Sequence, residues 1–152
     1  ADRLVLADVP VLVGPSTALP TTRADLVDAG YANAGLLARA GVRVGFQSNA
    51  NHSARDLPFA VGMAVGHGLD EDVALHGLTA GNADILGLAH EVGRIVPGLR
   101  ADLIVTDGSP LQITTQLGAV IIGGRDVGLA SKHTELYETY RERLQTPGVP
   151  SR

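Results

Sequence analysis

Two consecutive units of strand, loop and helix constrain the fold of this chain most strongly. Residues 9–14 are a short β-branched run that ends at Gly14. Residues 31–40 follow as a helix closed by Gly41, and residues 42–48 repeat the strand pattern. Strands that alternate with helices pair in parallel, with the helices packed on their faces, so these units predict a parallel α/β layer.

Three helices are predicted after the second strand. The first is expected over residues 56–67, with Asp56 as its N-cap. The second is expected over residues 70–78, where acidic residues in the first turn suit the helix dipole. The third is expected to begin at the cap Thr79 and to end near Leu86. The segment between the second strand and these helices is predicted to be a polar loop.

The periodicity changes after residue 90 to short strands separated by turn residues. We expect a strand over residues 92–96, a tight turn at residues 97–98 and a buried strand over residues 103–105. A hairpin return follows through residues 120–127, and residues 131–143 have the spacing of a final amphipathic helix. This region is predicted to be β-sandwich material followed by a helix.

Composition excludes several classes of protein. The chain has 152 residues, of which 45% are hydrophobic, enough for a core of its own. A formal charge of -4 and the lack of a basic cluster argue against nucleic acid as a partner. No apolar run reaches the roughly 18 residues of a membrane span, so we expect a soluble protein, cytoplasmic or exported, without a membrane partner. Because cysteine is absent, a metal would need His and carboxylate ligands.

Several short motifs, taken in order, resemble the closing part of imidazolonepropionase-like amidohydrolases. They are residues 9–15, 41–46, 54–59, 84–87, 97–98 and 101–103. The resemblance extends from about residue 1 to about residue 143. It depends on the order and spacing of the motifs, since each of them alone is only moderately specific.

The resemblance implies an α/β fold class, made of the last strands and helices of a TIM-like (β/α)8 barrel and the C-terminal part of a small β-sandwich. Residues 9–14 and 42–48 are then the seventh and eighth barrel strands. The implied domains are residues 1–89 for the barrel portion, 90–130 for the sandwich portion and 131–152 for the C-terminal helix and tail.

The resemblance also implies a metal-dependent hydrolase of amide or cyclic amide C–N bonds. Such enzymes hold one or two divalent ions, zinc or similar, with an H-x-H pair, later histidines and an aspartate, and a metal-bound water attacks the amide. This sequence contains neither an H-x-H nor an H-E-x-x-H motif. The metal is therefore expected only in an enzyme completed by a second polypeptide or by a missing N-terminal part.

One position of the implied catalytic apparatus falls within this chain. Relatives carry an Asp beside Ser48 or one residue later, whereas this sequence has Asn49 and Ala50. An amide does not accept a proton at neutral pH. Either the base has been lost, or Asp56 or a carboxylate of another chain substitutes for it. Asn49, in place of the family Asp, and His52 are the candidate catalytic residues.

The loops after the two predicted strands supply candidate substrate-binding residues, because the loops at the carboxyl ends of the strands carry the chemistry of TIM barrels. These candidates are Asn51, Ser53, Arg55, Ser16 and Thr17. Each also has a structural interpretation. Asn51 and Ser53 can satisfy backbone groups of the loop, Arg55 can brace Asp56, and the other two can form a turn.

The remaining histidines are interpreted as structural. His67 and His76 end successive helical segments, where a partial positive charge suits the helix dipole. His90 and His133 lie in the sandwich region and at the final helix, away from the predicted loops. No metal ligand is therefore assigned within this chain.

Two functions follow. In the first, the chain is the C-terminal portion or subunit of a metal-dependent C–N hydrolase, because two strands and a sandwich portion leave sheet edges and an apolar face for other protein to cover. In the second, it is a non-catalytic amidohydrolase-like scaffold or a homo-oligomeric binding protein that has kept the fold and lost the chemistry.

Overall fold

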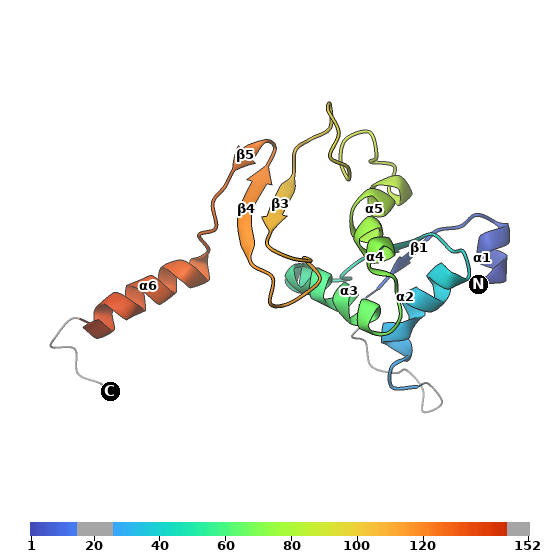
Figure 1. The fold of residues 1–152 in the computed structure, drawn as a ribbon, viewed down its shortest axis with the longest axis horizontal. Coiled ribbons are helices and arrows are strands. Elements are labelled where there is room, and N and C mark those ends of the chain that lie inside the picture. Colours follow the sequence, from blue (N-terminus) through green and yellow to red (C-terminus); the bar gives the residue numbers. More distant parts are fainter. Residues whose placement is uncertain (15–25, 146–152) are drawn as a thin grey trace.

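A computed structural model describes residues 1–14 and 26–145, which form a helical part around a strand pair and a separate small sheet (Figure 1). The helical part contains α1 (Asp2–Leu6), β1 (Val11–Val13), α2 (Ala29–Arg39), β2 (Val44–Phe46), the 3₁₀ helix η1 (Asn51–Asp56), α3 (Leu57–Gly66), α4 (Glu71–Leu78) and α5 (Ala80–Ile85). The remainder contains β3 (Leu103–Thr106), β4 (Leu117–Ile122), β5 (Arg125–Asp126) and α6 (Lys132–Gln145).

The predicted parallel pairing of the first two strands is confirmed. Val11 lies opposite Val44 and Val13 opposite Phe46 in a parallel register. The Val11 N–H donates to the Arg43 carbonyl at 2.9 Å, and the Gln47 N–H donates to the Val13 carbonyl at 3.0 Å. The carboxyl ends of both strands therefore lie at the same edge.

The core lies between this strand pair and the helices that follow it. Its buried side chains come from both strands, from α2, α3 and α4, and from two connecting segments: Val13, Ala34, Val44, Phe46, Val61, Ala64, Leu69, Ala74 and Leu111. Leu111 belongs to the segment between β3 and β4. A Cβ added at Gly62 of α3 would lie 2.3 Å from the Leu111 carbonyl oxygen, so the two backbones are in close contact. This contact ties the small sheet to the helical part.

The small sheet is antiparallel, with the strand order β3-β4-β5. Its hairpin return is confirmed, and the strand predicted over residues 103–105 forms as β3, although Ile104 and Val105 are exposed and not buried. The strand predicted over residues 92–96 is wrong, because these residues form bends and irregular backbone. Gly93 adopts a φ of 97° and packs so closely on α5 that an added Cβ would lie 2.6 Å from the Ala83 Cβ. Arg94 binds Asp84 at 2.7 Å. Gly93 and Arg94 therefore contact α5, whereas Ile95 and Val96 are exposed.

The polar loop predicted after β2 is also wrong, because residues 51–56 form η1 and run directly into α3. Asp56 has the helical angles φ -92° and ψ -4° and makes no capping hydrogen bond. Thr79 likewise does not cap α5, and its hydroxyl donates to the Leu75 carbonyl at 2.7 Å. Asp56 is the last residue of η1 and continues into α3, and the Thr79 hydroxyl binds back to the preceding α4, so neither side chain caps the helix that follows.

Asp70 is the predicted cap that the structure confirms, since its Oδ1 accepts from the Val73 N–H at 3.1 Å. We expect Asp70→Ala to lower the free energy of unfolding by about 1 kcal/mol, the usual cost of a lost N-cap. Asp56→Ala is the matched control and is expected to change it by less than about 0.5 kcal/mol. Urea denaturation of both variants tests the assignment, and equal losses would contradict it.

Asp102 joins the start of β3 to the turn between β4 and β5. Its carboxylate accepts from Arg100 Nε at 2.7 Å and from the Gly123 N–H at 2.8 Å. The Arg100 hydrogen bond, followed by that of Gly123, holds the pKa of Asp102 below its usual range. A carboxyl with a lowered pKa stabilises the folded state above its unfolded pKa, and this contribution is lost as the pH falls through the folded pKa.

We therefore expect Asp102→Asn to unfold more easily than the parent chain at neutral pH. The difference should shrink as the buffer is acidified through the carboxyl range, because the parent's carboxylate then takes up its proton. Asp28→Asn is the control, since the Asp28 side chain makes no capping hydrogen bond at α2. Thermal unfolding measured across this pH range checks the prediction, and a difference independent of pH would contradict it.

Candidate functional site

The candidate site is the turn that follows β2, beside the carboxyl end of β1. A Cβ added at Gly14 would lie 2.9 Å from Asn49 Nδ2, so the Asn49 side chain lies against the end of β1. Asn49 has a φ of 59°, a left-handed conformation that Asn and Asp adopt more readily than other non-glycine residues. This conformation turns the chain out of the strand and into η1.

Two serine hydroxyls stabilise the turn by hydrogen bonds to backbone carbonyls. The Ser48 hydroxyl donates to the Ala50 carbonyl at 3.0 Å. The Ser53 hydroxyl lies 3.2 Å from the same carbonyl and 3.3 Å from the carbonyl of Ser48. Both hydroxyls are thus used in holding the backbone, and the turn presents Asn49 in a defined position.

The structure brings the candidates of this turn together on one short helix. Asn51 and His52 are exposed in the first turn of η1. Arg55 is also exposed, and its Nε lies 3.7 Å from Asp56 Oδ1, as its structural interpretation expects. The candidates Ser16 and Thr17 lie outside the described residues. The polar groups that solvent reaches at this site are therefore two amides, an imidazole, a guanidinium and the carboxylate of Asp56.

Asn82 of α5 is a residue of this region that the sequence analysis did not single out. Its Nδ2 donates to the Phe46 carbonyl at 2.9 Å, and its Oδ1 accepts from the Phe46 N–H at 3.0 Å. The sequence indicated the contact between Asn82 and the strand only indirectly. Gly45 in the middle of a strand and Gly77 near the end of a helix indicate close backbone approach, but they do not say which side chain fills the space.

The side chains of the turn do not by themselves fit a metal ion. Across residues 1–14 and 26–145, no group of three His, Cys, Asp or Glu side chains is placed to hold one. The turn offers one imidazole, and the amide of Asn49 is a weaker ligand than a carboxylate. A metal at this site would need most of its ligands from outside the turn.

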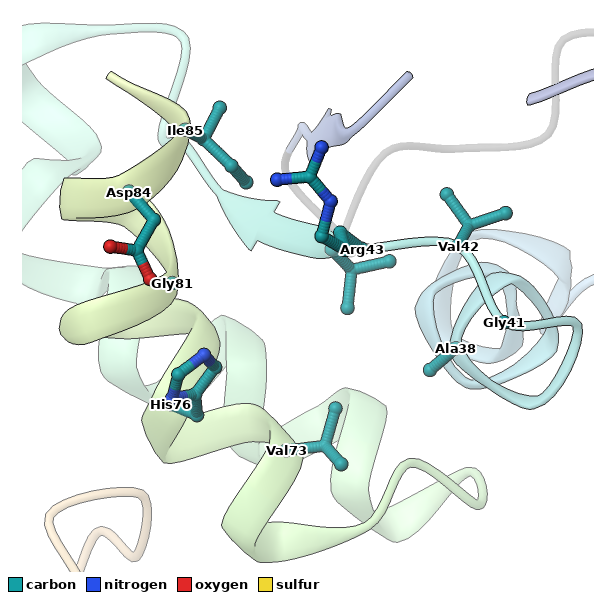
Figure 2. A pocket seen from close by; sticks show the side chains of 10 residues that line it. Ala38, Gly41, Val42, Arg43, Val73, His76, Gly81, Asp84 and Ile85 are labelled. Carbon is teal, nitrogen blue, oxygen red and sulfur yellow. The ribbon is translucent and has the colours of Figure 1, made fainter. Parts of the chain in front are cut away.

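A cavity of about 250 Å³ lies near the opposite end of β2, between that strand and helices α2, α4 and α5 (Figure 2). Arg43, His76 and Asp84 contribute its polar groups. Arg43 is 3.1 Å from Asp8, and Asp84 binds Arg94, whose hydrogen bond lowers the pKa of Asp84. Because both charges have partners and the cavity lies at the amino end of the strand, we assign it no chemistry.

Comparisons with known proteins agree with this geometry. Residues 12–134 match the family model described as "Amidohydrolase family". An amidohydrolase from Thermotoga maritima MSB8 superposes with a TM-score of 0.70 and 28% identity over 84% of this chain and 33% of that chain. A second amidohydrolase gives a TM-score of 0.57 and 26% identity over 86% of this chain and 33% of the other.

An uncharacterized protein is also similar, with a TM-score of 0.56 and 26% identity over 68% of this chain and 27% of that chain. No curated protein matches the sequence. The chain thus spans about a third or less of the length of these solved relatives. In the part of the chain that the structure describes, no helix combines the length and apolar character needed to cross a membrane.

Proposed function

Because the chain belongs to the amidohydrolase family, we propose that it is the C-terminal portion of a metal-dependent hydrolase of amide or cyclic amide C–N bonds. An upstream segment or a second polypeptide completes the barrel. The observation that carries this proposal is the parallel pair β1 and β2, which places Asn49 against Gly14 at the edge where a TIM barrel has its active site.

Members of the family generally use a divalent metal, which supplies an activated water when bound. The residues of the turn do not form a metal site, so we assign the ligands to the completing protein. Asn49 Nδ2 donates a hydrogen bond to a substrate oxygen, and the amide does not accept a proton from the attacking water. The exposed imidazole of His52 donates or accepts a proton during the reaction. Asn51 and Arg55 on η1 contact the polar groups of the substrate.

The surface of the small sheet supports the completion of the fold by other protein. Ile104 and Val105 are adjacent in β3 and point to opposite faces, yet their exposed fractions are 54% and 53%. Ile122 of β4 is 57% exposed. A groove of about 520 Å³, lined largely by apolar side chains, separates α5 from β3. A sheet with apolar residues on both faces is typical of a buried layer.

Complementation tests the proposed function. The chain is expressed alone and together with a segment that carries an H-x-H motif and the earlier barrel strands. Hydrolysis of dipeptides and cyclic amides, and stoichiometric zinc, manganese or iron by elemental analysis, are expected only in the combined sample. Activity and metal in the isolated chain, or in neither sample, would contradict the proposal.

The second candidate is a non-catalytic scaffold or homo-oligomeric binding protein, and the observation in its favour is the amide of Asn49 at the position where the family resemblance implies a base. In this case a second copy of the chain covers the apolar faces of the small sheet. The scaffold predicts a stable homo-oligomer without hydrolysis even when the barrel is completed. Sedimentation of the purified chain, measured beside the complementation assay, separates the two functions.

A further inference from the structure

The outer edge of β2 is occupied by a side chain. The hydrogen bonds to β1 use the backbone of Arg43 and Gln47, and successive peptide groups of a strand point to opposite sides, so the N–H and C=O of Phe46 point away from β1. Asn82 pairs with both of these groups, at 3.0 and 2.9 Å. A primary amide carries the same donor and acceptor as a peptide group. Asn82 therefore stands where the backbone of a neighbouring strand would pair.

Two glycines make room for this contact. A Cβ at Gly45 would lie 2.1 Å from Asn82 Oδ1. A Cβ at Gly77 of α4 would lie 2.7 Å from the ring of Phe46 and 3.0 Å from the Val44 carbonyl. Both α4 and α5 contact β2, and these glycines let the two helices approach its edge. The two glycines, one in the strand and one in a helix, thus leave the space in which Asn82 reaches the edge of β2.

We propose that Asn82 is a positioning residue that holds the carboxyl end of β2 and so fixes the turn that carries Asn49 and His52. The importance of that turn rests on the proposed function, whereas the contact itself does not. Phe46 is buried, and its peptide groups are costly to leave unpaired. A strand of the completing protein that pairs with Phe46 would have to displace the Asn82 amide. The expectation that the sheet edges are left open is therefore wrong at this residue.

Asn82→Asp tests the contact through its pH dependence. An ionised carboxylate can accept from the Phe46 N–H but repels the Phe46 carbonyl, whereas a protonated carboxyl has a donor and an acceptor and can make both hydrogen bonds. The folded state thus favours the protonated form and raises the pKa of the introduced carboxyl. The variant should be less stable than the parent chain at neutral pH, and the difference should shrink on acidification.

Other titratable groups near Asn82 are present in the parent chain as well, so their effects cancel in the difference. They are His76 on α4, Asp84 on α5, and Arg94, Arg100 and Asp102 along the neighbouring groove. Asn82→Ala is the control, because it loses both hydrogen bonds and introduces no titrating group. Its loss of stability relative to the parent should not change with pH.

Hydrogen exchange followed by NMR reports on the positioning. In Asn82→Ala the Phe46 amide should exchange roughly tenfold faster or more, and the signals of residues 47–53 should shift. In Asn82→Asp, the exchange rate of the Phe46 amide and the signals of residues 47–53 should both return toward the parent values in mildly acidic buffer. If that variant is unfolded at neutral pH, recovery of its native spectrum on acidification supports the proposal and continued unfolding overturns it.

The proposal is also overturned if the Phe46 amide stays protected in Asn82→Ala, or if Asn82→Asp follows the pH profile of the alanine variant. None of these readouts requires hydrolysis. A failure of the Asn82 contact is therefore distinguishable from a failure of the proposed function, which the complementation assay measures.

Discussion

Gly45→Ala is expected to lower the free energy of unfolding by about 3 kcal/mol, because it combines overpacking with the loss of buried hydrogen bonds. The new methyl group would lie 2.1 Å from Asn82 Oδ1, 2.8 Å from Leu12 Cδ2 and 3.0 Å from Ile85 Cδ1. The strand cannot shift to relieve these contacts, since its other edge is paired with β1. Urea denaturation, with the slope compared between variants, measures the loss.

Gly66→Ala of α3 is the matched control for this prediction. No atom lies within 4 Å of a Cβ at that position, and alanine is a better helix former than glycine, so the change should be neutral or stabilising by up to about 1 kcal/mol. In an Asn82→Ala background, Gly45→Ala should cost less, because the atom it meets at 2.1 Å is gone. Equal effects of the two glycine substitutions in the parent chain would contradict this account of the strand edge.

Asn49→Asp is expected to raise kcat/KM of the completed hydrolase by about 100-fold or more, because a carboxylate can accept the proton of the attacking water and an amide cannot. The substitution should leave the backbone unchanged. Asp tolerates the left-handed conformation of position 49, and Asp8 of this chain already adopts a φ of 48°. Steady-state kinetics with dipeptide and cyclic amide substrates measure the effect.

Ala54→Asp controls for the added charge, since residue 54 is exposed on η1, directly after the same turn, and has no assigned contact with the substrate. It should leave kcat/KM within a few-fold of the parent, because its carboxylate lies on η1 and not against the end of β1. A similar gain from both variants would indicate a general electrostatic effect. No gain from Asn49→Asp in an otherwise active assembly would show that position 49 does not face the reacting groups.

The sequence predicts well those elements in which the spacing of apolar residues matches the side chains that the structure buries. The β-branched runs of β1 and β2 and the capped helix that begins after Asp70 form where the patterns place them. The strand predicted over residues 92–96 does not form because Gly93 has a positive φ, which interrupts an extended backbone, and packs on α5. Asp56 fails as a cap because it continues the preceding η1, and Thr79 fails because its hydroxyl binds back to the Leu75 carbonyl of α4.

The sequence predicts where the candidate site lies in the fold, but not the hydrogen bonds that hold it. Parallel strands put Asn49 and His52 at the carboxyl edge, as their positions after the second strand indicate. The use of the Ser48 and Ser53 hydroxyls inside the turn depends on a local geometry that residue types do not specify. Asn82 lies 36 residues from Phe46, and a contact at that separation needs the tertiary fold.

The central claim is that this chain works as the last part of a larger metal-dependent hydrolase. The most direct test is the native mass and metal content of the particle that contains this chain when it is isolated from its source. The account predicts a particle well above the 15.7 kDa of this chain, with an H-x-H segment in the same or a second polypeptide, a stoichiometric divalent metal and hydrolysis of amides. A metal-free particle made of this chain alone would contradict it.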